Sequence, residues 1–201
     1  MYKRQALTVA QALLQNMEEK YALVIGSEEI SKIMDFKDRN TCVLFGDGAG
    51  ALVVGNGDGI FASYSNSAGN LEALKAPAIS KSNQDHYLTM AGQEVFKFAI
   101  KVIPESINAI LEKTNLTLDK IDYVVCHQAN YRIIKNVYKK MKSSEDKFYM
   151  NLQEYGNTSA ASIPLALGEM NEKGMLRPGD KIICVGFGGG LTWGATLMEW
   201  S

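Results

Sequence analysis

Residues 121–130 read IDYVVCHQAN, an apolar run rich in β-branched residues that ends in a histidine and two amides. This pattern predicts a buried strand that delivers polar groups at its carboxyl end. In open α/β folds the ligand crevice lies at the carboxyl ends of the strands, because the following turn leaves backbone and side chains uncommitted there. His127 is therefore a candidate for chemistry. The alternative is a structural histidine that is satisfied by the start of the next helix.

Two later motifs add polar groups and glycines to the same kind of position. Residues 155–164, YGNTSAASIP, put Asn157 in a turn just before a predicted helix. Residues 186–194, GFGGGLTWG, follow the predicted strand KIICV with five glycines. Taken by residue type alone, Asn157 is also explained as a helix cap and Phe187 as a core residue.

The motifs CHQAN, GNTSAAS and GFGGGLTWG, in this order and spacing, resemble the C-terminal signature of the 3-ketoacyl-acyl-carrier-protein synthase III family, condensing enzymes of the thiolase superfamily. The resemblance runs from about Ala6 to the C-terminus. It implies an α/β, thiolase-like fold, layered and built from duplicated halves, with an incomplete first half. Residues 1–84 would then be the remainder of the N-terminal half, and residues 85–201 the C-terminal half.

The order of predicted elements agrees with a duplication. A helix, a strand, a glycine turn and another strand occur twice, near the start and at the end of the chain. The glycines of GDGAG do not indicate a dinucleotide site, because such a fingerprint opens a helix, whereas ALVVG continues as a strand. The elements of the first copy are predicted at residues 5–19, 21–28 and 41–55. A further helix is predicted at residues 91–113, after the irregular, polar residues 70–84. Pro104 lies inside the last of these helices, where packing must compensate for it.

Composition limits the classes of function. With 46% hydrophobic and 21% charged residues, the chain is typical of a soluble globular protein. A formal net charge of −1 argues against general nucleic-acid binding, which needs a broad basic surface. No apolar run approaches the roughly 20 residues that span a bilayer, and no secretory signal is visible. The sequence therefore predicts a cytoplasmic protein that binds neither membrane nor nucleic acid, and two histidines without clustered ligands predict no metal site.

The three cysteines, Cys42, Cys126 and Cys184, lack CxxC spacing and are predicted to be reduced core residues. The resemblance places the family's nucleophilic cysteine immediately before Met1, outside this chain. Cys126 does not replace it, because neighbours on a strand point to opposite faces and His127 already faces the site. Cys42 and Cys184 lie in apolar strand-like runs, where a thiol ionises poorly. We therefore expect the C-terminal portion of a condensing enzyme that is inactive by itself.

The resemblance also implies a reaction: the decarboxylative Claisen condensation of acyl-CoA with malonyl-acyl carrier protein, which starts fatty acid synthesis. The coenzyme A thioester is a substrate, and no cofactor is permanently bound. His127 and Asn157 would bind the malonyl thioester carbonyl as carbon dioxide leaves. A neutral imidazole and a primary amide suit this task, since neither carries a charge that would quench the enolate. Gly189 would donate a backbone N–H to the acyl-cysteine oxyanion, a position for which we expect the φ freedom of glycine.

Coenzyme A is expected to contact two further residues. By residue type alone, residues 31–40 are a solvated loop that contains Arg39. The resemblance implies instead that Arg39 stacks on the adenine of coenzyme A, and that Asn130 also contacts it. A planar guanidinium suits stacking and phosphate pairing.

The basic helix after His127 has two interpretations. Its charges predict a solvated helix face, whereas the resemblance implies a docking surface for the acidic acyl carrier protein. The implied contacts are Lys97, Gln128, Ala129, Asn130, Tyr131, Arg132, Lys139 and Lys140. A homodimer is expected for the complete enzyme. The alternative function is a non-catalytic thiolase-like partner subunit or an acyl-carrier-protein-binding fragment, and the two oxyanion donors favour the enzyme.

Overall fold

The computed structural model describes residues 3–76 and 87–201, and for residues 3–5 it describes only the backbone. Its α-helices are α1 (Lys3–Leu14), α2 (Gly92–Thr114), α3 (Tyr131–Lys140), α4 (Leu152–Tyr155) and α5 (Ser162–Glu172). Its strands are β1 (Tyr21–Glu28), β2 (Gly48–Gly55), β3 (Ala62–Asn70), β4 (Leu74–Lys75), β5 (Thr89–Met90), β6 (Tyr123–Cys126), β7 (Lys181–Gly188) and β8 (Gly190–Glu199). Short 3₁₀ turns are η1 (Ile30–Ile33), η2 (Leu118–Lys120), η3 (Glu145–Lys147) and η4 (Ser159–Ala161).

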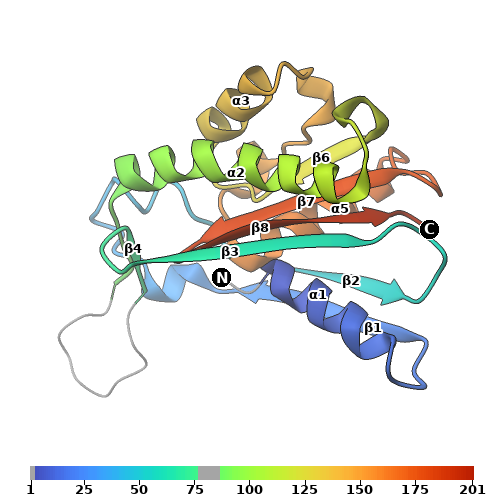
Figure 1. Ribbon diagram of the computed structural model, residues 1–201. Helices are drawn as coiled ribbons and strands as arrows, with labels where there is room; N and C mark the ends of the chain where they lie inside the picture. Colours follow the sequence, from blue (N-terminus) through green and yellow to red (C-terminus); the bar gives the residue numbers. More distant parts are fainter. Residues whose placement is uncertain (1–2, 77–86) are drawn as a thin grey trace.

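The main sheet has the strand order β3-β8-β7-β6. β3 and β7 both run antiparallel to β8, whereas β6 runs parallel to β7. Helices α2 and α3 cover one face of this sheet (Figure 1), and α1 and α5 lie between its other face and the antiparallel ribbon formed by β1 and β2. The result is a layered α/β arrangement.

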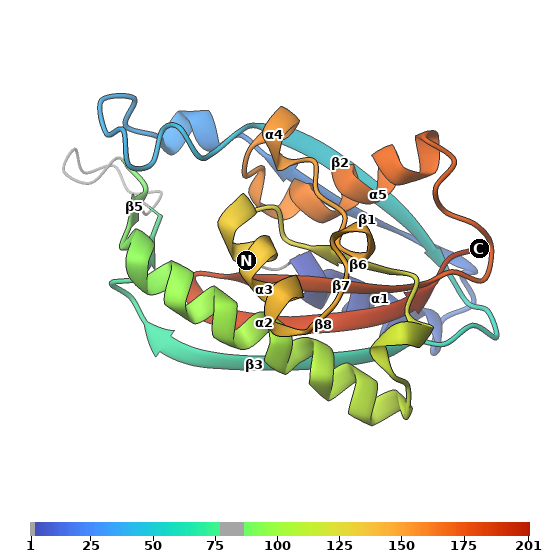
Figure 2. The same cartoon turned by 90° about the horizontal axis from the view of Figure 1, so that it is seen from above.

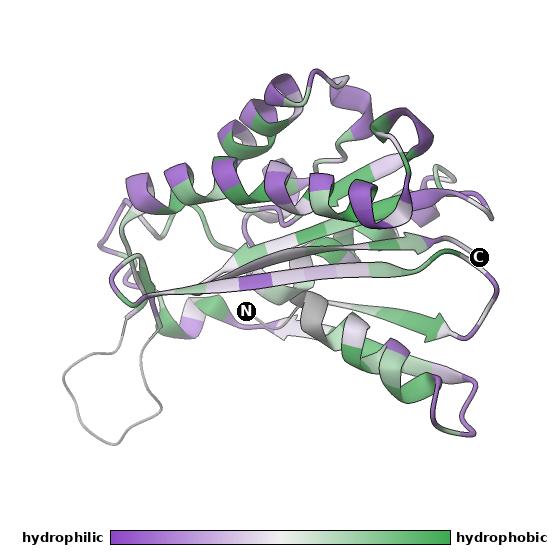
Figure 3. Ribbon diagram, viewed as in Figure 1, coloured by the Kyte–Doolittle hydropathy of each residue, from purple (hydrophilic) through white to green (hydrophobic). Residues whose placement is uncertain are grey.

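Strand β7 shows why the sequence run IICV is continuously apolar. Ile183 and Val185 pack in the same core as the apolar faces of α2 and α3, whereas Ile182 and Cys184 pack in a second core with α5. Since both faces of the strand are covered, neither set of alternating side chains reaches water. The hydrophilic residues of α2 and α3 lie on the sides that face away from the sheet (Figure 3).

The β1–β2 ribbon is covered on one face only. Along both strands, half-buried or buried positions alternate with exposed ones. Leu23, Ile25 and Val53 are 60%, 61% and 70% exposed, and Leu23 lies directly opposite Val53. We call these three residues the apolar stripe. An exposed apolar surface of this kind marks an interaction site more often than a solvated face.

The predicted elements agree with the structure in type, with two differences. Residues 41–45 were predicted as a strand, but residues 41–44 form turns, because Asp38 accepts hydrogen bonds from the backbone of Thr41 and Cys42 and from the Thr41 hydroxyl. Phe45 makes only an isolated bridge, to Asn157. The predicted first helix ends at Leu14, where Asn16 turns the chain and bonds its amide to the carbonyl of Ala12. Pro104 is buried within α2, as the sequence allowed.

The helix–strand–strand repeat is present as α1-β1-β2 and α5-β7-β8, with antiparallel pairing in both copies. The division of the chain at residue 84 stays a proposal. Residues 77–86 of that predicted boundary lie outside the described residues. β3, which precedes the boundary, pairs with β8 in the main sheet.

β1 approaches the turn before α5 very closely. An added Cβ at Gly26 would lie 2.5 Å from the backbone oxygen of Ala160, so no side chain fits there. Two residues further along β1, Glu28 accepts a hydrogen bond of 3.0 Å from the backbone N–H of Ala160. The ribbon therefore supports the turn that carries Asn157.

We expect Gly26→Ala to lower the free energy of unfolding by about 1–3 kcal/mol, because overpacking against rigid backbone forces the ribbon and the turn apart. The matched control is Gly57→Ala, since nothing lies within 4 Å of an added Cβ at Gly57. Urea unfolding of both variants measures the difference. Equal midpoints for the two variants would show that the ribbon does not depend on this contact.

Candidate functional site

His127 lies one residue beyond β6 and is 6% exposed. Its backbone N–H donates to the carbonyl of Val185 at 2.7 Å, so pairing with β7 extends to this residue. Its Nδ1 lies 2.7 Å from the hydroxyl of Ser162, the first residue of α5. Phe187 contacts the imidazole edge to face, with ring centroids 5.2 Å apart. The imidazole is therefore positioned by a hydroxyl and an aromatic ring from two other elements.

Ser162 is a functional candidate that the sequence reasoning missed. The residue belongs to the GNTSAAS motif, but only Asn157 of that motif was assigned a role. Its partner His127 is 35 residues away in the chain. The available signal was a small polar residue at the start of a helix that follows the motif, and that signal also describes an ordinary helix terminus.

Asn157 is fixed through its backbone and its side chain. Its N–H donates to the carbonyl of Leu44 at 2.8 Å, and its carbonyl accepts from the N–H of Gly46 at 3.1 Å. Its side-chain oxygen accepts from the N–H of Ser159 at 3.0 Å, which leaves the amide NH₂ as the group for other partners. The cap interpretation thus explains the oxygen of Asn157 but not its NH₂ group.

Gly156 allows this pairing. It has φ of 66°, and an added Cβ would lie 3.2 Å from the carbonyl oxygen of Leu44. Both the positive φ and the close backbone favour glycine here.

Gly189 lies between β7 and β8, next to Leu74. The positive φ in this turn, 138°, belongs to Gly190 and not to Gly189. The conformational reason we gave for glycine at position 189 is therefore wrong. The role of its N–H as an oxyanion donor stays a proposal.

Two of the three cysteines are unsuited to be nucleophiles. Burial raises the pKa of the Cys126 thiol far above its ordinary value, and the nearby Cys184 raises it further. Burial alone raises the pKa of Cys184 to about 12. Cys42 is half-buried and lies in the turns at residues 41–44 rather than in the strand that we predicted.

Gln128 is buried, with 1% of its surface exposed. Its amide nitrogen donates to the carbonyls of Cys126 at 2.8 Å and Tyr149 at 3.2 Å. Its oxygen accepts from the N–H of Asn151 at 3.1 Å. Because the whole amide is used within the protein, its side chain offers nothing to a docking partner.

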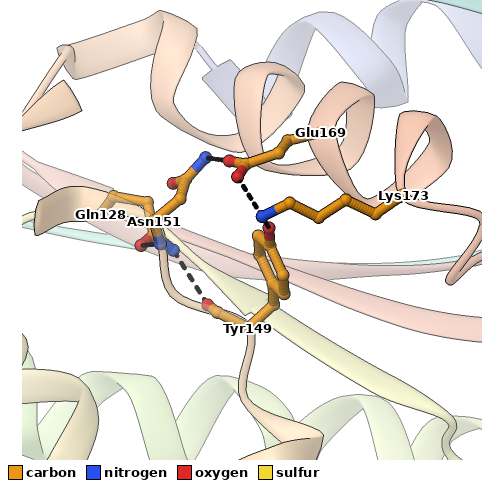
Figure 4. Close-up of polar contacts among 5 residues, drawn as sticks. All are labelled: Gln128, Tyr149, Asn151, Glu169 and Lys173. Atoms are coloured by element: carbon orange, nitrogen blue, oxygen red, sulfur yellow. Dashed lines mark hydrogen bonds and ion pairs between the residues drawn. The ribbon is translucent and has the colours of Figure 1, made fainter. Parts of the chain in front are cut away.

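A polar network continues from Asn151 to α5 (Figure 4). The amide of Asn151 donates to Glu169 at 2.6 Å, and Lys173 contacts both Glu169 and, at 3.2 Å, the hydroxyl of Tyr149. Burial by itself raises the pKa of the Glu169 carboxyl. The hydrogen bonds from Lys173 and Asn151 outweigh burial and hold that pKa below its ordinary value of 4.5.

The remaining predicted contact residues lie near or on the surface. Asn130 caps α3 by accepting from the N–H of Arg132 at 2.8 Å. Tyr131 is 42% exposed, with the ammonium of Lys135 lying 5.2 Å from its ring centre. Ala129 is half-buried. The four predicted basic contacts are all exposed on the adjacent helices α2 and α3 (Figure 2): Lys97, Arg132, Lys139 and Lys140.

The structure thus brings His127, Ser162 and Phe187 together and ties His127 and Asn157 to the same turn. Arg39 is exposed in the loop between η1 and β2, outside this set. Within residues 3–76 and 87–201, no three His, Cys, Asp or Glu side chains are grouped so that they could hold a metal ion. In the same ranges, no helix is long and apolar enough to cross a membrane.

Two family models match the chain. Residues 4–69 match 3-oxoacyl-[acyl-carrier-protein] synthase III, and residues 111–200 match the C-terminal model of the same family. The chain is 51% identical to β-ketoacyl-[acyl-carrier-protein] synthase III of Clostridium novyi (strain NT) and 50% identical to that of Clostridium botulinum (strain 657 / Type Ba4). The alignments cover 98% and 97% of this chain but 64% of each relative.

Solved structures give the same result. The 3-oxoacyl-[acyl-carrier-protein] synthase III of Aquifex aeolicus VF5 matches with a TM-score of 0.90 and 40% identity, over 98% of this chain and 64% of that one. The Thermus thermophilus β-ketoacyl-[acyl carrier protein] synthase III matches with a TM-score of 0.92 and 38% identity, over 99% and 65%. The predicted thiolase-like α/β fold is confirmed.

The Glu169 network predicts a pH effect on stability. Since the folded pKa of Glu169 lies below its unfolded value, the stabilisation is complete above about pH 4.5 and is lost as the pH falls through the folded pKa. We expect Glu169→Gln to cost about 1 kcal/mol at pH 7 and to reduce the loss of stability on acidification. Urea unfolding at several pH values measures both effects.

The control is Glu172→Gln, which removes the same charge from an exposed position on α5. This variant should keep the acid-dependent loss of stability seen in the parent chain. An unchanged pH dependence in Glu169→Gln would show that the network does not stabilise the folded state.

Proposed function

This chain belongs to the 3-oxoacyl-[acyl-carrier-protein] synthase III family of condensing acyltransferases, and we propose that it supplies the part of such an enzyme that activates the carrier-bound substrate. The chain spans about 64% of the length of the curated relatives that it matches. The proposed reaction is the decarboxylative condensation of acyl-CoA with malonyl-acyl carrier protein in the cytoplasm, the first condensation of fatty acid synthesis. No permanently bound cofactor is part of the proposal.

The observation that carries the proposal is the common support of His127 and Asn157. Ser162 contacts the imidazole, and Ser159 holds the amide oxygen, so one turn orients both groups. Orientation before the reaction is what a site needs to stabilise a charge that develops on an oxygen. In the proposal, both side chains bind the malonyl thioester oxygen as carbon dioxide leaves, and the enolate then attacks the acyl group.

The acyl group itself must be held by another residue. Cys126 and Cys184 are buried thiols with raised pKa values, and neither suits a nucleophile. We propose that the acyl-carrying cysteine comes from outside the 201 residues, so that this chain alone does not complete the condensation. Gly189 would donate its N–H to the oxygen of that acyl group, and Phe187 would provide an apolar wall beside His127.

The substrates would reach the site past α2 and α3. We propose that Lys97, Arg132, Lys139 and Lys140 attract the acidic carrier protein, with Ala129, Asn130 and Tyr131 at the start of α3 in contact with it. Gln128 is left out of this surface because it is buried and its amide is fully bonded. Arg39 and Asn130 are the proposed contacts to coenzyme A.

A second candidate function is that of a non-catalytic thiolase-like partner, and the exposed apolar stripe favours association of some kind. In a complete enzyme, the same stripe would be covered by the part of the family fold that this chain does not include or by the second subunit of a homodimer. The oriented pair of His127 and Asn157 distinguishes the two functions. A purely structural subunit has no need of it.

The function is tested in a fusion of this chain with the part of the Clostridium novyi relative that it does not cover. We expect His127→Ala or Asn157→Ala to slow malonyl decarboxylation by about a hundredfold or more, as loss of an oxyanion donor does. Transfer of the acyl group to cysteine should be affected less, because that step uses a different oxyanion. Rapid mixing followed by mass spectrometry separates the two steps.

The isolated chain is the control for the fusion, and the relative losses in the two half-reactions distinguish the two candidate functions. The 201-residue chain incubated with acyl-CoA should acquire no acyl adduct, and a turnover-competent adduct on Cys42, Cys126 or Cys184 would show that the nucleophile is misplaced. Equal losses in both half-reactions of the fusion would assign His127 and Asn157 to structural support, and would favour the partner function.

Carrier-protein docking is tested by charge reversal. We expect Arg132→Glu with Lys139→Glu to weaken binding of an acyl carrier protein by about tenfold or more, and added salt to weaken binding of the parent chain by screening. Fluorescence anisotropy with labelled carrier protein measures both effects.

The matched control reverses two exposed charges elsewhere, Lys20→Glu with Arg177→Glu. It changes the net charge equally and should change binding much less. Binding that is independent of salt, or equally weakened by both pairs, would rule out a specific basic surface on α3.

A further inference from the structure

The hydroxyl of Ser162 has two neighbours within hydrogen-bond distance. It lies 2.7 Å from Nδ1 of His127, and the backbone N–H of Gln128 points to it in a longer contact of 3.4 Å. Ser162 is 2% exposed, so its hydroxyl is shielded from bulk solvent. In the part of the chain that the structure describes, no other acceptor lies within reach of this hydroxyl.

These contacts distinguish the two neutral forms of the imidazole. If Nδ1 carried the proton, the hydroxyl would accept from both Nδ1 and the N–H of Gln128, and its own proton would face no acceptor. If Nδ1 is unprotonated, the hydroxyl donates to it and accepts from Gln128, so that the hydroxyl, Nδ1 and the Gln128 N–H are all satisfied. Because a buried donor without a partner is costly, the second arrangement is favoured by about tenfold or more.

We propose that Ser162 is a positioning residue that holds His127 in the tautomer with the proton on Nε2. A neutral imidazole then presents an N–H on the side of the ring away from α5. The assignment of that N–H to the thioester oxygen rests on the function proposed above, whereas the tautomer itself rests only on the hydrogen bonds.

The same turn orients Asn157 by the same principle. The N–H of Ser159 occupies the acceptor oxygen of the Asn157 amide, at 3.0 Å. The hydroxyl of Ser162 occupies the acceptor nitrogen of His127. Both side chains therefore have an acceptor atom engaged by residues 159–162. A site for an oxyanion requires donors and no competing acceptors.

The tautomer is measured directly by long-range ¹H–¹⁵N NMR of the chain labelled with ¹⁵N-histidine. The sequence has two histidines, and His86→Gln identifies the signals of His127. At neutral pH we expect Nε2 to be protonated and Nδ1 to be unprotonated in the parent chain. A proton on Nδ1 in the parent chain overturns the proposal, and this result needs no variant at position 162.

Variants test whether Ser162 is the cause. We expect Ser162→Ala to move both ring nitrogens toward the average of the two tautomers, and Ser162→Thr, which keeps a hydroxyl, to restore the parent signals. The control is Ser106→Ala, which removes a buried hydroxyl bonded to the carbonyl of Val102 at 2.7 Å and should leave His127 unchanged. Unchanged His127 signals in Ser162→Ala overturn the proposal.

Kinetics of the fusion then separate this proposal from the proposed function. We expect Ser162→Ala to lower kcat for malonyl decarboxylation by about tenfold with a smaller effect on KM, and Ser162→Thr to restore it. A changed tautomer with unchanged decarboxylation overturns the oxyanion role of His127 and leaves the action of Ser162 on the tautomer standing.

Discussion

The turn at residues 156–162 is held from both sides, and the candidate site depends on this. On one side, Asn157 pairs through its backbone with Leu44 and Gly46, and Ala160 rests on β1. On the other side, Ser162 begins α5 and contacts His127 at the end of β6. Segments from the first and the second half of the sequence thus meet at one turn. Because backbone groups make most of these contacts, a shift of the turn would break several hydrogen bonds at once.

The end of β6 is fixed by a second, independent set of contacts. Gln128 bonds to Tyr149 and to Asn151, the two ends of the segment 149–151. The polar network links that segment to Glu169 on α5 and to Lys173 at its end. His127 and Gln128 are therefore tied to α5 at two points, His127 through the hydroxyl of Ser162 and Gln128 through Asn151 and the carboxylate of Glu169. Side chains that are held by packing and by hydrogen bonds keep the geometry that a catalytic group requires.

The main sheet and the β1–β2 ribbon differ in how their faces are covered. The main sheet is covered by helices on both faces, and its strand β7 is buried almost throughout. The β1–β2 ribbon supports the turn with its inner face, but its outer face carries the apolar stripe. The family relatives are longer than this chain. The ribbon therefore joins the candidate site to a surface that is suited to contact with further protein.

The sequence alone determined the features that depend on local periodicity. The buried strand that ends at His127, the strand β7 and the amphipathic basic helix α3 each follow from the spacing of apolar residues, because backbone geometry sets that spacing. The three motifs together also indicated the family. Only the tertiary structure decided which side chains meet. Ser162 contacts a residue 35 positions away, and Gln128 accepts from one 23 positions away. Such partners are selected by packing between distant segments, and no periodic pattern in the chain encodes them.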